Sequence, residues 1–460
     1  MRGRLAGDSR ITGDRRQTLS RKRLSRRKDT GRKGAHLNTR RQALDALCDI
    51  TDRGAYANLR VKQLTSSLLE REAKLAAALV YHTLDHLLTI DYYLAHFVKG
   101  SQKPVIRGIL RLGVCELLFL STPAHAALNE SVTLTKEVGK SGLSGFVNAV
   151  LRNIDRNRAS LPPFPSEPVA RLSIQYSYPE WIVREWVNRF GEAETEALLS
   201  RPQSAIEVRA QYPYTRDELQ KSLPVASTVN SLDENSLSLE SGFDLASHPL
   251  FLEGKFTVMG ESAMLACRTL GDMRGKRVLD ACAAPGGKSA YLASLSQNDI
   301  QLTCFELHPH RKELLDKTLA RLHVAADTFI KDAAEFDPAL EVAFDGVLID
   351  APCSGLGLLG DKPDIRYSKS DRDITELVEI QKHILEACAR YVKHGGVLVY
   401  ATCTISQREN EAQTDAFLHA HKEFVLEEIP ISVANDGQVQ LLPHVHHTDG
   451  FYIARMRRCI

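Results

Sequence analysis

Residues 277–289 read RVLDACAAPGGKS, and this stretch decides the class of fold. It starts with a short apolar run that ends in Asp280, as expected of a buried strand, and a helical pattern follows from Ala290 to Leu295. A glycine-rich turn from a strand into a helix lets a ligand approach backbone N–H groups closely. Its last residues also occur in phosphate-binding Walker loops. However, Cys282 stands where that loop requires glycine, which excludes a nucleoside triphosphatase.

Strand and helix patterns alternate from about residue 260 onward, which is typical of a doubly wound sheet. Further strand-like apolar runs occupy residues 301–305, 329–330, 344–349 and 395–400. Parallel strands deliver their carboxyl ends to one edge of a sheet, where open α/β sheets bind ligands. We therefore predict the functional site at that edge.

Acidic residues follow three of these strands. Glu306, 26 residues after Asp280, is placed to accept hydrogen bonds from ribose hydroxyls, and Asp332 is placed to hold the amino edge of an adenine. Asp350 ends the next strand. Three acids in this order behind one glycine-rich turn predict S-adenosylmethionine as the cofactor. NAD is the main alternative, but the Gly-x-Gly-x-x-Gly pattern that usually accompanies it is missing.

A cysteine follows each of two predicted strands. The motif DAPCSG at residues 350–355 carries Cys353, and ATCT at residues 401–404 carries Cys403. Because both strands end at the same edge, we expect both thiols to reach the same crevice, which indicates covalent chemistry on a pyrimidine ring. The alternative is that each cysteine is a small buried apolar side chain. This is how we interpret Cys282 and Cys304.

The composition is that of a multidomain protein without a membrane span. The chain has 460 residues, of which 43% are hydrophobic, and no run of about 18 apolar residues. Because no signal-peptide pattern opens the sequence, we predict a cytoplasmic protein with reduced cysteines. None of the nine cysteines forms a Cys-x-x-Cys, and His444, His446 and His447 lack matching acids or cysteines, so we predict no metal site.

The first 37 residues form a basic tail. Residues 1–40 contain fourteen Lys or Arg and three Asp, a local charge of +11 that leaves −9 on the rest of a chain whose net charge is +2. This composition predicts a disordered, solvated segment. Two alternatives stay open: an arm that binds RNA phosphates, and an organelle transit peptide or an artefact of start-site choice.

Three further regions follow the tail. Apolar residues at spacings of three and four predict an all-α domain over residues 38–160, for example in segments 41–53, 70–88 and 105–120. The proline-rich stretch LPPFP at residues 161–165 marks a boundary. Residues 161–258 combine amphipathic helices with short β-like runs, which predicts a small α+β connecting domain. Residues 259–460 form the predicted Rossmann-like α/β domain.

Four motifs together resemble the RNA 5-methylcytosine methyltransferases of the Nol1/Nop2/Sun family. They are DACAAPGGKS at 280–289, DAPCSG at 350–355, PDIRY at 363–367 and YATCT at 400–404. GFVNAVLR at 145–152 and TDGFYIAR at 448–455 are similar to the bacterial Sun/Fmu, RsmB-type subgroup of that family. The resemblance covers about residues 40–460. It implies a NusB-like N-terminal domain that binds RNA, followed by a Rossmann-like methyltransferase domain.

The resemblance also implies the reaction, a methyl transfer from S-adenosylmethionine to C5 of a cytosine in 16S ribosomal RNA. Family members first add a cysteine thiolate to C6, because cytosine C5 alone is too weak a nucleophile. By resemblance, Cys403 attacks C6, Cys353 helps to release the methylated base, and Asp350 hydrogen-bonds or protonates N3. A thiol with a pKa of about 8.5 is only a few per cent ionised at neutral pH, so Cys403 needs activation by its surroundings. Having both cysteines argues for RNA, since DNA cytosine methyltransferases attack with the thiol of their Pro-Cys motif.

The resemblance carries over a cofactor site as well. Its residues are Cys282, Ala283, Ala284, Pro285, Gly286, Gly287, Lys288, Glu306, Asp332 and Asp350. Lys288 is also placed in the catalytic set, where it orients the cofactor loop or the base. For proton donation Asp350 must itself be protonated or share a proton, which burial beside the base favours. Glu306 stands where aspartate is frequent in the family, a change that keeps the carboxylate.

The RNA target is less sharply defined than the chemistry. VMGESA at 258–263 and LLGDK at 358–362 depart from the family pattern and lack possible RNA contacts. In the helical domain the candidate phosphate contacts are Arg107, Arg111, Lys136, Lys140, Arg152, Arg156 and Arg158. The alternative is a packing module with ordinary surface charges.

The expected partner is 16S ribosomal RNA, either naked or in an early small-subunit particle. We expect a monomer without metal or membrane partners. Two other functions stay open: the same chemistry on transfer RNA, and a catalytically idle, RNA-binding ribosome assembly factor.

Overall fold

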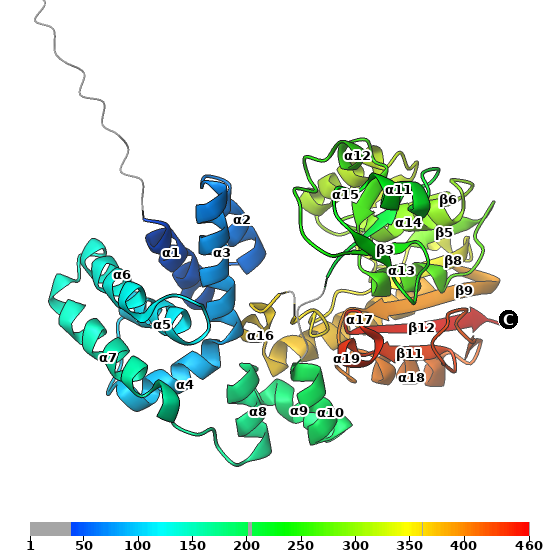
Figure 1. The fold of residues 1–460 in the computed structure, drawn as a ribbon. Helices are drawn as coiled ribbons and strands as arrows, with labels where there is room; N and C mark the ends of the chain where they lie inside the picture. Colours follow the sequence, from blue (N-terminus) through cyan, green and yellow to red (C-terminus); the bar gives the residue numbers. More distant parts are fainter. Residues whose placement is uncertain (1–37, 201–204, 361, 460) are drawn as a thin grey trace, which may run out of the picture. The chain divides into compact units, whose positions relative to one another are not determined.

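The computed structural model describes residues 38–200, 205–360 and 362–459, and the predicted basic tail lies outside them. Figure 1 traces these residues from the helices of the first half of the sequence to the sheets of the second. The predicted fold class is confirmed, with an all-α N-terminal domain and a C-terminal α/β domain. In the described part of the chain, no helix has both the length and the apolar character needed to cross a bilayer.

Packed α-helices form the N-terminal domain. They are α1 (Thr39–Arg53), α2 (Ala57–Thr65), α3 (Glu70–Asp85), α4 (Leu87–Phe97), α5 (Pro104–Leu118), α6 (Ala124–Glu137) and α7 (Ser144–Arg156). Helix α5 is central, because residues on all its sides are buried and the surrounding helices pack on it. The pattern over residues 70–88 predicted one helix. Instead the backbone leaves helical geometry at His86 (φ −114°, ψ 21°), which separates α3 from α4.

The connecting region contains a helical part and a small sheet. Its helices are α8 (Pro168–Tyr176), α9 (Glu180–Phe190) and α10 (Glu192–Leu199), which share a core with Leu356 and Ile374 of the C-terminal domain. Trp186 is buried in this core. The small antiparallel sheet has the order β2-β3-β1-β4. Its strands are β1 (Ile206–Ala210), β2 (Ser227–Val229), β3 (Ser236–Leu239) and β4 (Phe256–Val258), accompanied by α11 (Arg216–Ser222) and α12 (Pro249–Leu252).

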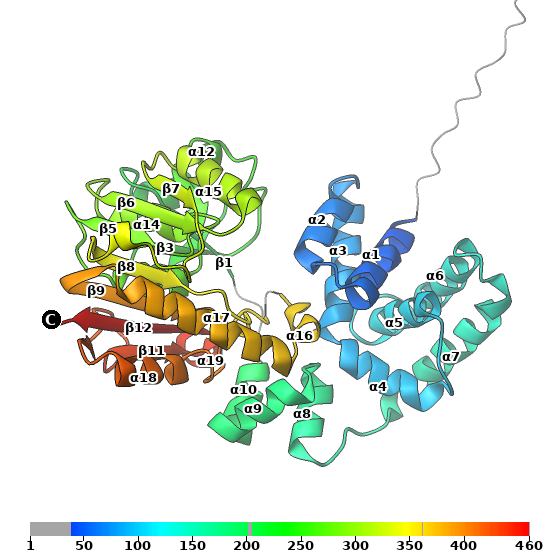
Figure 2. The same ribbon diagram turned by 180° about the vertical axis from the view of Figure 1, so that it is seen from behind.

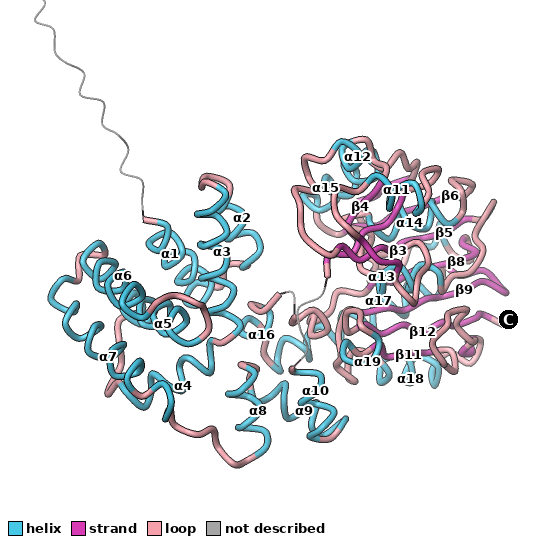
Figure 3. The backbone as a smooth tube through the Cα atoms, viewed as in Figure 1, coloured by secondary structure: helices cyan, strands magenta, loops and turns pink. Residues whose placement is uncertain are grey.

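The large sheet has the strand order β10-β12-β9-β8-β5-β6-β7, with β11 paired to β12. Its parallel strands are β5 (Arg277–Asp280), β6 (Gln301–Glu306), β7 (Asp327–Ile330), β8 (Phe344–Asp350) and β9 (Val392–Thr402), all predicted from apolar runs. The antiparallel strands are β10 (Phe424–Leu426), β11 (Gln438–Leu441) and β12 (Phe451–Arg458). Figure 3 shows these strands side by side in magenta.

Helices cover both faces of this sheet, which explains why its strands are continuous apolar runs. Successive side chains of a strand point to opposite faces. Accordingly, Val278 packs in the core with α13 (Glu261–Arg268), α14 (Gly287–Leu295) and α15 (Pro309–Arg321), whereas Leu279 packs with α17 (Asp371–Ala389). Figure 2 shows α17 lying along the strands, with α18 (Glu411–Ala420) beyond it. The remaining α-helices of the described residues are α16 (Ile365–Ser368) and α19 (Pro443–His446).

The strand order fixes where a ligand binds. From β5 the chain proceeds outward through β6 and β7, and then returns to β8 on the other side of β5. This reversal makes the carboxyl ends of β5 and β8 a topological switch point, where open α/β sheets bind their ligands.

Candidate active site

The two predicted cysteines meet at the carboxyl edge of the sheet. Strands β8 and β9 are parallel neighbours in which Asp350 pairs with Ala401, so the loops that follow them leave the sheet together. The sulfur of Cys353 lies 3.2 Å from the sulfur of Cys403. The hydrogen bond with Cys403, and then burial, raise the pKa of Cys353 well above its ordinary value. The thiol form of Cys353 is therefore favoured over its thiolate.

A half-buried ion pair lies beside the thiols. The Nζ atom of Lys288, in the first turn of α14, lies 2.6 Å from Oδ2 of Asp350 at the end of β8. Burial alone would lower the pKa of Lys288, but Asp350, and to a smaller extent Cys403, raise it above its ordinary value. Lys288 is therefore a cation at neutral pH. Its positive charge interacts electrostatically with a thiolate at Cys403.

The predicted cofactor loop forms a tight turn between β5 and α14. Gly286 has a φ of +104°, and an added Cβ would come within 3.0 Å of Leu315, so glycine is required there. Asp280 is buried; its Oδ2 accepts a hydrogen bond from Ser289 (2.6 Å), while among the described residues its Oδ1 has no partner. Burial raises the pKa of Asp280 to about 6. An unpartnered buried oxygen and a turn this close to the helix fit a polar ligand at the switch point.

The strand-end acids line the same edge. Oε1 of Glu306 accepts a hydrogen bond from the backbone N–H of His308 at 2.9 Å, and Oδ1 of Asp332 accepts one from Ala334 at 2.9 Å. Strands β5, β6 and β7 are adjacent in the sheet, so Asp280, Glu306 and Asp332 follow one another along it. Cys304 is a buried core side chain, as predicted, whereas Cys282 is half-buried.

Comparison with known proteins identifies two matching regions. The sequence model described as "16S rRNA methyltransferase RsmB/F" matches residues 268–457, and that of the NusB family matches residues 37–156. A Bacillus subtilis protein named "Probable ribosomal RNA small subunit methyltransferase B" is 36% identical over 442 residues, which cover 90% of this chain and 98% of the relative. The Shewanella oneidensis ribosomal RNA small subunit methyltransferase B is 31% identical, with 91% of this chain and 99% of the relative covered.

The chain belongs to the RsmB/F family of 16S rRNA methyltransferases. The crystal structure of PH0851 has the same fold, with a TM-score of 0.76 and 24% identity; the match covers 90% of this chain and 98% of that one. Both predicted halves are confirmed by these matches, namely the NusB domain and the Rossmann-like methyltransferase domain. RsmB/F membership thus accounts for nearly the whole described chain.

A cavity of about 740 Å³ opens at the two thiols of this RsmB/F domain. Cys353, Ser354 and Cys403 contribute to its wall, and residues of the helical domain, among them Tyr56 and Arg107, line it as well. Tyr56 is 68% exposed, so its ring is free to contact another molecule. Both cysteines thus lie in the wall of one cavity.

The PDIRY motif of residues 363–367 contributes to the wall of this cavity. Oδ2 of Asp364 accepts a hydrogen bond from the backbone N–H of Ala57 (3.1 Å), and the hydroxyl of Tyr367 donates to the carbonyl of Leu84 (2.8 Å). Arg366 is buried and stacks over the ring of Tyr178 at 4.0 Å. The motif is thus a structural element of the cavity wall.

The candidate phosphate contacts fall into two groups. Arg107 forms an ion pair with Asp52, and Arg111 forms one with Asp91, both at 2.6 Å. Their charges are thus balanced within the protein. Four others are exposed on α6, on α7 and just beyond it, namely Lys136, Arg152, Arg156 and Arg158, while Lys140 is half-buried.

The histidines near the C-terminal end do not gather into a metal site. His444 lies 2.6 Å from Glu194, and Nδ1 of His446 contacts the backbone of Leu442. Across residues 38–200, 205–360 and 362–459, no cluster of three or more metal-binding side chains occurs.

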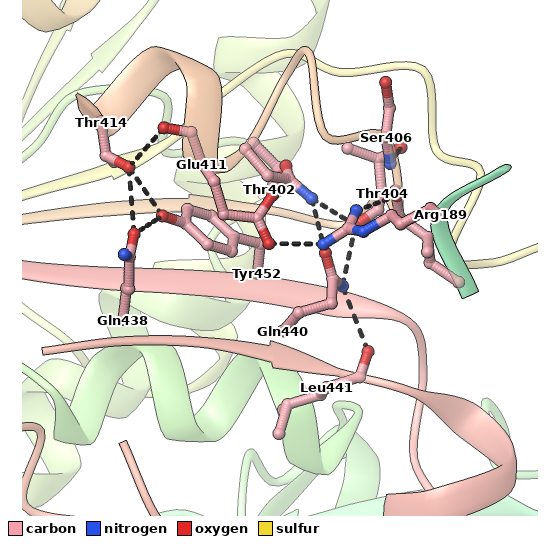
Figure 4. Close-up of polar contacts among 12 residues, drawn as sticks. Arg189, Thr402, Thr404, Ser406, Glu411, Thr414, Gln438, Gln440, Leu441 and Tyr452 are labelled. Atoms are coloured by element: carbon pink, nitrogen blue, oxygen red, sulfur yellow. Dashed lines mark hydrogen bonds and ion pairs between the residues drawn. The ribbon is translucent and has the colours of Figure 1, made fainter. Parts of the chain in front are cut away.

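Several residues that hold the cysteine loops were not predicted from the sequence. Gly357 donates its backbone N–H to the carbonyl of Cys403 at 3.0 Å and accepts one from Gly450 at 3.0 Å. Figure 4 shows Gln440 beside Thr404 and Arg189 paired with Glu411. Arg189 also donates to the carbonyl of Ile405 at 2.8 Å. The only hint in the sequence was the TDGFYIAR motif, which contains Gly450.

Proposed function

We propose that this chain transfers the methyl group of S-adenosylmethionine to C5 of a cytosine in 16S ribosomal RNA, through a transient bond between Cys403 and cytosine C6. The observation that carries the proposal is the pair of sulfurs 3.2 Å apart, beside the Lys288–Asp350 ion pair at the switch point. Membership of the RsmB/F family supports ribosomal RNA as the substrate.

In the first step the Cys403 thiolate forms a bond to C6, and the electrons of the C5–C6 double bond shift into the ring. Asp350 binds N3 of the base. Because N3 accepts hydrogen bonds, the Lys288–Asp350 pair must supply a proton there, and we assign the Lys288 ammonium, which donates to Asp350, as its source. The resulting electron-rich C5 is the nucleophile for methylation.

The cofactor loop and the strand-end acids are the residues that we assign to bind the methyl donor. They are Cys282, Ala283, Ala284, Pro285, Gly286, Gly287, Lys288, Glu306, Asp332 and Asp350. When bound, S-adenosylmethionine supplies a methyl group on a positively charged sulfur. The unpartnered buried Oδ1 of Asp280 supports a polar ligand at this position.

Release of the base reverses the first bond. Once the C5 proton is lost to water, the Cys403–C6 bond breaks, the ring regains its double bond, and the electron pair returns to the sulfur of Cys403. The proton on N3 returns to the Lys288–Asp350 pair. Cys353 keeps its proton because the Cys403 hydrogen bond and burial raise its pKa. Its thiol is therefore suited to donate to the departing sulfur, which is the role that we assign to it.

Bisulfite sequencing of total RNA tests the reaction and the substrate together. Cells that lack this protein are complemented with the wild type or with Cys403→Ser. We expect one cytosine of 16S RNA to be protected from conversion only by the wild type.

Two outcomes would change the proposal. Protection restored in transfer RNA would keep the chemistry and replace the substrate. Protection by neither protein, while the wild type still binds RNA, would favour an assembly factor without catalytic activity.

A further inference from the structure

A buried carboxylate lies behind the two cysteine loops. Glu409, six residues after Cys403, has no exposed surface, and its side chain accepts four hydrogen bonds. Oε1 accepts from the backbone N–H of Ser354 (2.8 Å) and from Gln381 (3.0 Å), and Oε2 accepts from the hydroxyls of Ser354 (2.5 Å) and Thr404 (3.3 Å). All four donors are neutral. A charged group at such a site is costly to bury unless its hydrogen bonds are satisfied, as they are here.

The donors to Glu409 come from both cysteine loops. Ser354 directly follows Cys353, and Thr404 directly follows Cys403. The two hydroxyls also contact each other, with 2.8 Å between Oγ of Ser354 and Oγ1 of Thr404. The third residue that donates to Glu409 is Gln381 on α17, which also donates to the carbonyl of Pro352 at 2.9 Å. One carboxylate thereby ties the residue next to each of the two sulfurs to the helix that covers the sheet.

We infer that Glu409 is a positioning residue that sets the separation of the Cys353 and Cys403 sulfurs. Its effect on the reaction rests on the function proposed above, but its effect on the thiols does not. The backbone bond from Gly357 to the carbonyl of Cys403 ties the same two loops at another point. Glu409 adds a link between the residues directly next to the two sulfurs, Ser354 and Thr404.

Glu409 also acts through its charge. After the Cys403 hydrogen bond and burial, its negative charge further raises the pKa of Cys353. Geometry and charge are separable by substitution. Glutamine keeps an oxygen for Ser354 and Gln381 and offers its amide to hydroxyls that can turn to accept, whereas alanine removes every bond.

Capture by a trivalent arsenical tests the geometry without RNA or cofactor. Phenylarsine oxide exchanges its oxygen for two thiol sulfurs of neighbouring cysteines, forming two As–S bonds and releasing one water. We expect the wild type to bind it about 100-fold more tightly than Cys353→Ser, because the second sulfur acts as a tethered ligand. Glu409→Ala should lose most of this advantage, and Glu409→Gln should retain it.

Controls separate positioning from unfolding. Asp415→Ala, an exposed site on α18, should bind the arsenical like the wild type. If Glu409→Ala does not fold, Thr404→Val takes its place, because it removes one bond to the carboxylate and the contact with Ser354. Wild-type arsenical affinity in a folded Glu409→Ala or Thr404→Val protein would overturn the inference.

Kinetics on RNA provide the second readout. Glu409→Ala should lower kcat by about 100-fold, as expected when reacting groups move by about 1 Å, with little change in KM for RNA. Glu409→Gln should keep kcat within a few fold and shift the pH dependence of base release toward lower pH, because the charge that disfavours ionisation of Cys353 is gone. If base release by Glu409→Gln has the same pH dependence as in the wild type, the charge of Glu409 has no effect on Cys353. If Glu409→Ala loses arsenical capture but the wild type methylates no RNA, the positioning role of Glu409 is supported and the proposed function is rejected.

Discussion

At the scale of single residues, burial and close neighbours shift the pKa of several groups in the site. Cys353 and Cys403 are the same chemical group at 3.2 Å from each other, yet the hydrogen bond between them and the burial of Cys353 raise the pKa of Cys353. The proposed reaction needs one thiolate and one thiol, because only a thiolate attacks C6 and only a thiol can donate to the departing sulfur.

Trapping the intermediate tests these roles. Cys353→Ala should accumulate a protein–RNA adduct that survives denaturing electrophoresis, because attack by Cys403 proceeds while release is slowed. Cys403→Ala should form no adduct and serves as the matched control. An adduct that appears only when Cys403 is absent would exchange the two assignments.

Asp280 predicts a pH dependence of stability. Its pKa is raised from 3.8 to about 6 by burial, so between those values the folded protein binds more protons than the unfolded chain. Stability attributable to this group therefore falls as the pH rises from about 4 to 6, by about 3 kcal/mol in total. The free energy of unfolding can be measured with urea at pH 4 and pH 7. Between these pH values it should fall more in the wild type than in Asp280→Asn. An unchanged difference between the two proteins would contradict the raised pKa.

At the scale of elements, the pairing of β8 with β9 brings the sulfurs together. Asp350 and Ala401 are partners in this pairing, and the cysteines follow them by three and two residues. The apolar runs predicted both strands and their common edge, and so the meeting of Cys353 with Cys403. The sequence did not predict Glu409 or Gln381, because their hydrogen bonds depend on how α17 packs on the sheet.

Gly357 shows how closely the loop after β8 packs against the turn before β12. A Cβ at this position would lie 1.7 Å from the carbonyl oxygen of Gly450, with backbone on both sides. Gly357→Ala must therefore displace the Cys353 loop, and we expect a lower melting temperature and loss of methylation. Gly145→Ala on α7 is the control, since a Cβ there meets no atom within 4 Å. Wild-type melting and methylation in Gly357→Ala would show that the loops can separate without consequence.

At the scale of the whole molecule, the sequence predicted the order of the helical and α/β regions but not the contacts that connect them. The PDIRY motif was noticed for its resemblance to a family, yet its Asp364 and Tyr367 bond to Ala57 and Leu84. Such contacts join residues about 280 to 310 positions apart, which no local pattern encodes. Local periodicity and turn chemistry are sufficient for strands and helices, whereas long-range polar contacts arise only from the packed fold.

The position of β12 has a consequence for synthesis of the protein. Although it is the last strand in the sequence, it lies inside the sheet, hydrogen-bonded to β9 and β10, and it follows the turn at Gly450 that bonds to Gly357. A ribosome translating this message therefore produces the strands that carry both cysteines well before the strand that completes their sheet. We therefore expect a chain truncated by a nonsense codon before Gly450 to lose the partner of Gly357 and the strand beside β9, and with them the packing that holds both cysteine loops.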